Sequence, residues 1–346
     1  MTDTAIKASE KGANRTSRFG GYAEKAGLPG LLLILIVLFC VLPSTADSFR
    51  SENNIKNVLA NQSVTGLIAL AMVVPLISGY FDLSVAAIAG LSNVTVASLV
   101  VNHGQPLAVS LIAGVVVGVL AGCINAFLIS ALNLDAFVAT LGTYIFWSGT
   151  LALYTGGKTI ANGIPLDFSL WTIQTWFGVP RPFWILAATA LVVWFVLTQT
   201  PFGRQLSAIG SNELAAGLAG IRTRRAVALS YVAAGLLAGL AGALLTSSNG
   251  GGDSTSAISY LFPALAAVFL GRTAINPGQY NVWGTVLGLF FVATAVNGFT
   301  LMGAAASVTQ MFNGAALVVS LAIATLTARA RERRARQIQL QSLHSS

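Results

Sequence analysis

The chain has 346 residues, of which 55% are hydrophobic and only 9% are charged, and its formal net charge at pH 7 is +8. A soluble domain usually carries about a quarter charged residues, so this composition excludes an ordinary soluble protein and indicates a chain that lies in a lipid bilayer. The basic residues form no separate domain, which argues against a nucleic-acid partner.

A polar and basic N-terminal tail, residues 1–27, precedes the first apolar run, LPGLLLILIVLFCVLP. A basic head before an apolar run also occurs in signal peptides. This head is long, however, and no Ala-x-Ala-like cleavage site follows the run. We therefore expect the run to be retained as the first membrane span.

Nine further apolar runs have the length of about 17–25 residues that suits a helix crossing the hydrocarbon layer. They cover residues 57–78, 83–101, 106–130, 134–154, 183–199, 226–247, 257–272, 281–301 and 305–328. The predicted fold class is an all-α, polytopic membrane protein with about ten transmembrane helices in one domain, residues 28–328. A basic tail, residues 329–346, follows. Cys40 and Cys123 lie in different runs, so we expect no disulfide framework.

The distribution of lysine and arginine predicts the orientation, because an even number of spans puts both termini on one side. Fifteen of the 19 basic residues then share that side: five in the N-terminal tail, four in 203–225, Arg272, and five in the C-terminal tail. Arg50, Lys56, Lys158 and Arg181 fall on the other side. By the positive-inside rule both termini are cytoplasmic. We expect a multi-pass protein of the bacterial inner membrane.

Two glycine-rich segments share a pattern. GVVVGVLAGCINAFL (114–128) and GTVLGLFFVATAVNGF (284–299) both carry glycines at four-residue spacing and an asparagine near the far end. The pattern is consistent with a duplicated half of the chain. It is equally typical of close packing between helices through small residues, which we favour.

The spans contain almost none of the ionisable groups that ion-driven transporters need. Asp82 and Asp135 stand at predicted cytoplasmic starts of spans, where a carboxylate serves as a helix cap. The glycines at 249–252 are not followed by the Gly-Lys-Ser/Thr of a phosphate-binding loop, so we expect a loop or the end of a span there. We expect no catalytic site, no metal site and no bound cofactor. A passive channel for small polar solutes, a scaffold protein, or a transporter driven by another chain remain.

The loop 200–225 distinguishes these classes, because it predicts a short helix over 211–221. Ser211 or Asn212 is a good N-cap, Glu213 suits the first turn, and Gly220 can end the helix. Leu214, Leu218 and Ile221 share one face by their spacing, and Ala215, Ala216 and Gly217 keep the helix slim. Such a helix is too short to be stable alone. It needs a surface, either a partner protein or the lipid headgroups.

This stretch resembles a known family. Phe202-Gly-Arg204, Ala208-Ile-Gly210, Asn212-Glu213 and Gly220-Ile221 are similar to the coupling loop of permease subunits in bacterial ABC importers of the ribose/xylose/galactose type. Asp82-Leu-Ser-Val85 and Gly235-Leu-Leu-Ala238 also match, and the similarity runs from about 50 to 328. Tyr260-Leu-Phe-Pro263 and Leu270-Gly-Arg272 depart from the family pattern near the expected pathway, which leaves the sugar open.

The resemblance implies the partners. Two permease copies would form the pore, a separate ATPase subunit would use ATP and Mg²⁺ beneath them, and a periplasmic binding protein would deliver the substrate. Arg204, with residues 211–221, would then form the contact with the ATPase. Polar and aromatic residues inside the spans are the candidates for the pathway, with interhelical hydrogen bonding or core packing as the alternative. They are Asn61, Asn93, Asn125, Thr140, Asn297 and Asn313, with Phe262 and Phe269 as gates.

Overall fold

The computed structural model describes residues 26–344, without the side chains of 324 and 327–344. Of the described residues, 78% are helical, which confirms the predicted class of an all-α, polytopic membrane protein. Residues 1–25 of the predicted N-terminal tail lie outside the described residues, and residues 26 and 27 belong to the helix Ala26–Val41. The expected boundary at 328 is not a helix end, because the backbone of the last helix, α15 (Ala306–His344), continues through it.

Within residues 26–344, seven helices are long and apolar enough to cross a membrane. They are α3 (Glu52–Ile77), α5 (Leu107–Ala126) with its π-helical end (Phe127–Ala131), α6 (Ala136–Thr155), α8 (Arg181–Gln199), α11 (Thr223–Asn249), α14 (Val282–Leu301) and the first part of α15. Three shorter apolar helices occupy the other predicted spans: Ala26–Val41, α4 (Val85–Val101), and α12 (Ser256–Ser259) continued by α13 (Leu261–Gly271).

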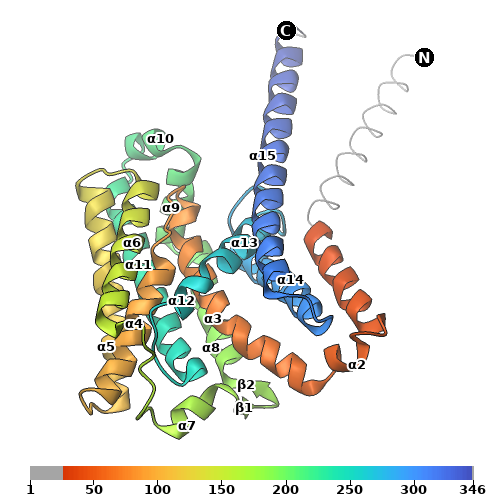
Figure 1. Cartoon of the computed structure of the whole chain (residues 1–346). Coiled ribbons are helices and arrows are strands. Elements are labelled where there is room, and N and C mark those ends of the chain that lie inside the picture. Colours follow the sequence, from red (N-terminus) through yellow and green to blue (C-terminus); the bar gives the residue numbers. More distant parts are fainter. Residues whose placement is uncertain (1–25, 345–346) are drawn as a thin grey trace.

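The helices form two groups (Figure 1). One group is built around α11, which packs against α5, α4 and α3, and the other joins α13, α14 and α15. The helix α3 contacts α8, α13 and α14 as well as α11, so it connects the two groups. A β-carbon placed at Gly66, near the middle of α3, would lie 2.6 Å from Leu186 of α8 and 2.9 Å from Leu289 of α14. The middle of α3 is therefore held closely between these two helices.

Glycines allow the closest helix contacts. A β-carbon at Gly118 of α5 would lie 2.5 Å from the carbonyl oxygen of Gly235 on α11, and one at Gly235 would lie 2.9 Å from the α-carbon of Gly122. In the other group, a β-carbon at Gly271 of α13 would lie 2.5 Å from the backbone of Gly284 on α14. Both glycine-rich segments thus serve close packing, which confirms the favoured reading of their shared pattern.

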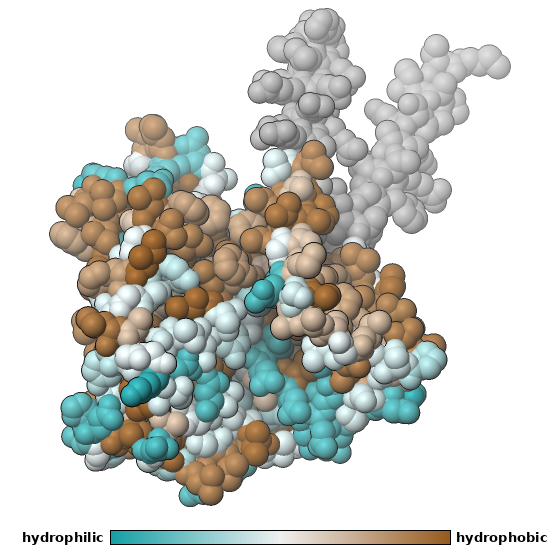
Figure 2. Space-filling view, viewed as in Figure 1, coloured by the Kyte–Doolittle hydropathy of each residue, from teal (hydrophilic) through white to brown (hydrophobic). Residues whose placement is uncertain are grey.

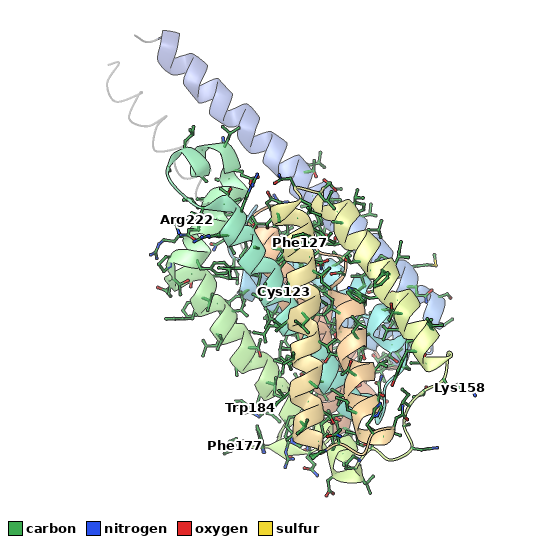
Figure 3. The ribbon with its side chains drawn as sticks, turned by 90° about the vertical axis from the view of Figure 1, so that its left-hand side faces the viewer. Cys123, Phe127, Lys158, Phe177, Trp184 and Arg222 are labelled. Carbon is green, nitrogen blue, oxygen red and sulfur yellow. The ribbon has the colours of Figure 1, made fainter. Side chains whose placement is uncertain are left out.

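The two ends of the molecule differ. The short helix α10 (Glu213–Leu218) and the end of α15 lie at the upper end in Figure 1, whereas α2 (Ala46–Phe49), α7 (Leu166–Ser169) and the strands β1 (Thr175–Trp176) and β2 (Val179–Pro180) lie at the lower end. The sticks view agrees: Arg222 is at one end, and Lys158, Phe177 and Trp184 are at the other (Figure 3). Hydrophobic atoms project at the tip where α10 lies (Figure 2).

The segment 156–182, which connects α6 to α8, contains short ordered elements. It contains α7, a 3₁₀ turn (Leu170–Thr172) and the β1–β2 hairpin, and Ile160 pairs with Gly252 in an isolated antiparallel bridge. The Arg181 guanidinium lies 5.8 Å from the ring centre of Trp171 and 5.5 Å from that of Trp176. Tryptophans and arginines of this kind are typical of a membrane–water interface.

Candidate functional site

The predicted loop 200–225 begins with a helix that we did not expect. Pro201 stands at the first position of α9 (Pro201–Ser211), where its fixed φ and missing N–H cost nothing. Leu206 and Ile209 are buried, and Phe202 packs beside them. The spacing of these three apolar residues, i, i+4 and i+7, was a sufficient signal for an amphipathic helix.

Two glycines fix α9 against the membrane helices. A β-carbon at Gly210 would overlap the carbonyl oxygen of Ile77, the last residue of α3, and one at Gly203 would overlap that of Leu197 on α8. No side chain fits at either place. The backbone of α9 therefore lies directly on the ends of α3 and α8.

A second, short helix follows at the predicted place. Asn212 is the N-cap of α10, and its side-chain oxygen accepts a hydrogen bond from the Ala215 N–H at 3.0 Å. Of the two N-cap candidates the structure selects Asn212, since Ser211 belongs to α9. Gly220 follows the helix with φ of +85°, the left-handed conformation that glycine adopts easily. With Glu213–Leu218 as its bounds, α10 is shorter than the predicted helix.

The two leucines of α10 face outward. The exposed fraction is 77% for Leu214 and 85% for Leu218, whereas Ala216 is buried. Ala215 and Gly217 are also exposed. The prediction that Ile221 shares the leucine face is wrong, because the helix ends before it and Ile221 packs against the main core. The exposed apolar surface of α10 is thus a leucine pair.

A hydrogen bond ties α10 to the connection between α3 and α4. The Tyr80 hydroxyl donates to Oε2 of Glu213 at 2.9 Å. Burial, and then the bond to this carboxylate, raise the pKa of Tyr80 to about 12, so the phenol keeps its proton at neutral pH. Together with the Gly210 contact, this bond links α10 and α9 to the end of α3.

The arginines around this loop are exposed. Nη1 of Arg204 donates to the Gln199 carbonyl at 3.4 Å, a long bond. Arg222 stands at the N-cap position of α11 without a side-chain capping bond. Arg224 and Arg225 follow in its first turn and are exposed. Their charges are available to lipid phosphates or to a partner.

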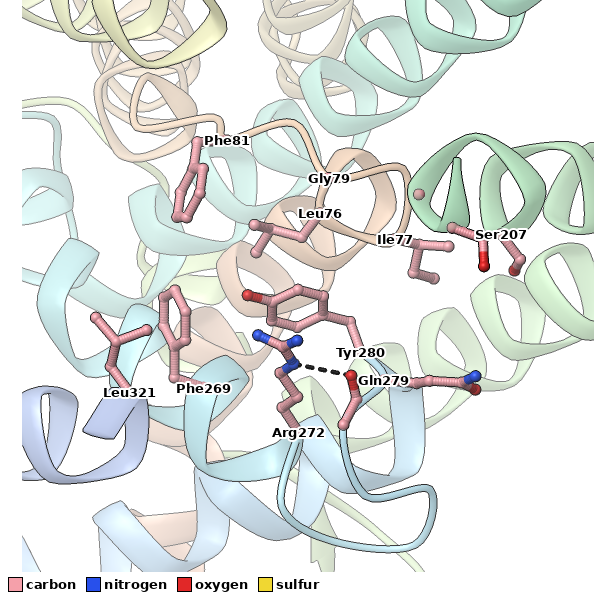
Figure 4. Close-up of a pocket in the computed structure, with 13 residues that line it drawn as sticks. Leu76, Ile77, Gly79, Phe81, Ser207, Phe269, Arg272, Gln279, Tyr280 and Leu321 are labelled. Atoms are coloured by element: carbon pink, nitrogen blue, oxygen red, sulfur yellow. Dashed lines mark hydrogen bonds between the residues drawn. The ribbon is translucent and has the colours of Figure 1, made fainter. Parts of the chain in front are cut away.

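A cavity of about 520 Å³ lies behind α9, where the two helix groups meet (Figure 4). Ile77 and Ser207 line it from α3 and α9, and Arg272 and Tyr280 line it from the connection 272–281. Nε of Arg272 donates to the Gly278 carbonyl at 3.0 Å, and its guanidinium lies 4.9 Å from the Tyr280 ring centre. Phe269, one of the predicted gates, stacks on Phe81 in this cavity, whereas Phe262 is exposed.

The two predicted capping carboxylates differ. Oδ1 of Asp135 accepts from the Val138 N–H at 3.0 Å, which confirms it as the N-cap of α6. The prediction is wrong for Asp82, because Ser84 is the N-cap of α4 and Oδ1 of Asp82 accepts from the Ser84 N–H and hydroxyl. Asp82 is buried, and its Oδ2 has no hydrogen-bond partner among the described residues. Burial raises the pKa of this carboxyl to about 6.

Asp82→Asn is therefore expected to stabilise the folded protein at pH 7.5 by about 3 kcal/mol. The folded protein holds the Asp82 proton more tightly than the unfolded chain, so the free energy of unfolding falls as pH rises from about 4 to 6. Above that range the buried carboxylate destabilises the folded protein. Thermal unfolding in detergent at pH 7.5 and pH 4.5 tests this, and the gain should shrink at the lower pH. Asp135→Asn, which keeps a good N-cap, is the control. An equal loss for Asp82→Asn at both pH values contradicts the assignment.

Three of the predicted pathway residues are buried and form hydrogen bonds. Nδ2 of Asn93 donates to Thr246 Oγ1 and the Gly251 carbonyl, both at 3.1 Å. Nδ2 of Asn125 donates to Ser84 Oγ at 2.7 Å, and Thr143 donates to its Oδ1 at 2.9 Å. Thr140 accepts from the Leu83 N–H at 3.2 Å. In this conformation these side chains form hydrogen bonds between helices and loops. This is the structural role given above as the alternative to a place in the pathway.

The other predicted pathway residues lie in different surroundings. Asn297 of α14 exchanges two amide hydrogen bonds with Asn54 of α3, at 3.0 and 2.8 Å. Asn313 is buried, and its Oδ1 has no partner among the described residues. Asn61 is exposed on α3. The structure does not bring the whole predicted set together in one site.

Comparison with known proteins assigns the family. Residues 54–321 match the family model described as the branched-chain amino acid transport system permease component. The chain is 34% identical to the ribose import permease of Bacillus subtilis (strain 168) over 305 residues, 88% of this chain and 93% of that protein. It is 30% identical to the ribose import permease of Escherichia coli (strain K12), over 79% of this chain and 85% of that protein. It is also 30% identical to the L-arabinose transport system permease of that strain, over 86% and 90%.

No solved structure matches the chain. The family match begins after the helix Ala26–Val41 and covers most of the transmembrane domain, including the loop that carries α9 and α10. The chain therefore belongs to the transport-system permease family that this model describes.

Proposed function

We propose that this chain is the permease subunit of an ATP-driven ABC importer in the bacterial inner membrane, and that its cargo is a pentose or a similar neutral polyol. The family description names branched-chain amino acids, but the relatives quoted above are named for ribose and L-arabinose. Those relatives cover almost the full transmembrane domain. They support a sugar as the cargo.

The observation that carries the proposal is α10. Its leucine pair is exposed on a helix of six residues, and so short a helix needs a surface to lie on. The surface that we propose is a cleft of a separate ATPase subunit, which would bind and use ATP and Mg²⁺ itself. A passive channel has no need of such an element.

The orientation follows from the charges. We place α10 in the cytoplasm with both termini, and count ten spans by adding the three shorter apolar helices to the seven long ones. Among the described residues, Arg204, Arg222, Arg224, Arg225 and Arg272 then lie on the cytoplasmic side and Arg50, Lys56, Lys158 and Arg181 on the periplasmic side. A periplasmic binding protein would deliver the sugar to that second side, and two copies of the permease would enclose the pore.

The link from α10 to α3 supports a mechanism. When ATP draws the two ATPase subunits together, a docked α10 moves with its cleft, and the Tyr80–Glu213 bond and the Gly210 contact carry the displacement to α3. ATP can favour one state of the pore only through contacts that differ between the states. The contact between α10 and the cleft would be one of them.

Uptake into proteoliposomes tests the proposal. The permease, its ATPase and its binding protein are reconstituted with labelled ribose or L-arabinose, with ATP on the cytoplasmic side. We expect accumulation above the outside concentration only with ATP and the binding protein present. Equilibration of the sugar without ATP would instead show a passive channel, and accumulation of a branched-chain amino acid would overturn the cargo.

A further inference from the structure

The first half of α3 carries a row of asparagines with no partners. Asn53, Asn57 and Asn61 are spaced at i, i+4 and i+8, so they lie along one face of the helix. All three are exposed, and none makes a side-chain hydrogen bond among the described residues. Their neighbour Asn54 differs, because it is paired with Asn297. We call Asn53, Asn57 and Asn61 the asparagine row.

The asparagine row reaches membrane depth. The hydrocarbon layer is about 30 Å thick, which corresponds to about 20 helical residues. Counted from Ile77 at the α9 end, Asn61 lies about 24 Å along the axis and Asn57 about 30 Å. A tilted helix would place both still deeper inside the layer. At least Asn61 therefore lies at the level of the lipid tails.

An unpaired amide cannot face those tails without a cost of several kcal/mol. The faces that other membrane-crossing helices leave exposed look different in this protein. The exposed side chains of α5 include Val109, Ile112, Val116 and Leu120, and those of α8 include Leu191, Val192 and Phe195. The face of α3 with the asparagine row must meet water or polar groups instead.

We propose that the asparagine row lines a water-filled vestibule, open to the side opposite α10, and hydrogen-bonds the hydroxyls of a neutral sugar on its way in. An amide both donates and accepts hydrogen bonds, which suits vicinal hydroxyls and leaves the surface without charge. Residues at i and i+4 lie about 6 Å apart, so the sugar can exchange one amide for the next. This inference rests on the proposed function, since it names how the proposed cargo enters.

The row stops inside the bundle. The next position on the same face is Thr65, which is buried, and Gly66 beside it is held by Leu186 and Leu289. The vestibule is thus closed at the middle of α3 in this conformation. At its outer end, Lys56 and Glu52 form an ion pair beside the row.

Thiol labelling tests for water in the vestibule. In a chain with Cys40→Ser and Cys123→Ser, each of Asn57→Cys, Asn61→Cys and Ile112→Cys is added singly and treated from the periplasmic side with a charged methanethiosulfonate. We expect reaction at positions 57 and 61 and none at 112, the exposed apolar control on α5. No reaction at 57 and 61, or a disulfide between two permease copies that blocks the reagent, overturns the proposal.

Transport tests for contact with the sugar. Asn57→Leu/Asn61→Leu should lower pentose uptake at least tenfold, whereas Asn57→Gln/Asn61→Gln should retain most of it. The leucine variant should keep its ATPase association, since α10 is unchanged. Unchanged uptake in the leucine variant overturns the contact. A failure of the proposed function would appear differently, as absence of ATP-driven pentose uptake by the unaltered chain, and would leave the labelling result standing.

Discussion

Leu214→Glu/Leu218→Glu is expected to abolish ATP-driven uptake and to weaken the association with the ATPase at least about 100-fold. Both leucines are largely exposed in the permease alone, so the substitutions leave its core untouched. In a cleft, however, each buried leucine contributes about 2 kcal/mol, and an unpaired carboxylate in its place costs more. Co-purification with the ATPase, and uptake by proteoliposomes, measure the two effects.

The control for this variant is Gln205→Glu. It adds one negative charge, where the double leucine variant adds two, at an exposed position of the adjacent helix α9, and it should retain both association and uptake. The melting temperature of the permease alone should be the same for the three proteins. Normal uptake by the double leucine variant would show that α10 has no part in coupling. Equal losses of association and uptake in the control would show that the added charge alone causes the effect.

Gly235→Val is expected to prevent stable folding of the transmembrane domain. A side chain at this position would overlap the backbone of Gly118 and Gly122 on α5, and backbone cannot move aside as a flexible side chain can. Overpacking in a core typically costs 1–3 kcal/mol, and we expect a loss of about 3 kcal/mol or more because α11 contacts α5, α4 and α3 at once. The yield of monodisperse protein in detergent and its melting temperature measure the loss.

The matched control is Gly142→Val on α6. A β-carbon there would meet nothing within 4 Å, so the same change of residue type should lower the melting temperature by only a few degrees. A melting temperature for Gly235→Val close to that of the control would show that α5 and α11 can separate without unfolding the domain.

Much of the fold could be predicted from hydrophobic runs and charges. Each predicted span contains a helix, because an apolar chain in lipid must satisfy its own backbone hydrogen bonds. The ends of the helices were harder to predict from the sequence. The polar first turns of α3, from Glu52, lie outside any apolar run, and the segment 156–182 includes a pairing of Ile160 with Gly252, a residue distant in sequence.

In the candidate functional site, too, only the features set by residues close in sequence could be predicted. Asn212 and Gly220 could be assigned from local chemistry, since caps act within a few residues of the chain. The positions of Asn93 and Asn125 could not, because their partners Gly251 and Ser84 are distant in sequence. Asn53 and Asn57 were missed for another reason: Asn53 precedes the predicted span 57–78 and Asn57 is its first residue, so the apolar pattern does not single them out.

The Gly66 contact has a geometric consequence for α3. The helix runs unbroken from Glu52 to Ile77 and is gripped near its midpoint by Leu186 and Leu289. If α3 moves as one unit about this contact, a push on the Ile77 end in one direction swings the Glu52 end in the other. The pathway would then narrow at one membrane face and widen at the opposite face in a single movement. The two faces could not be open at the same time, so a solute could not leak through.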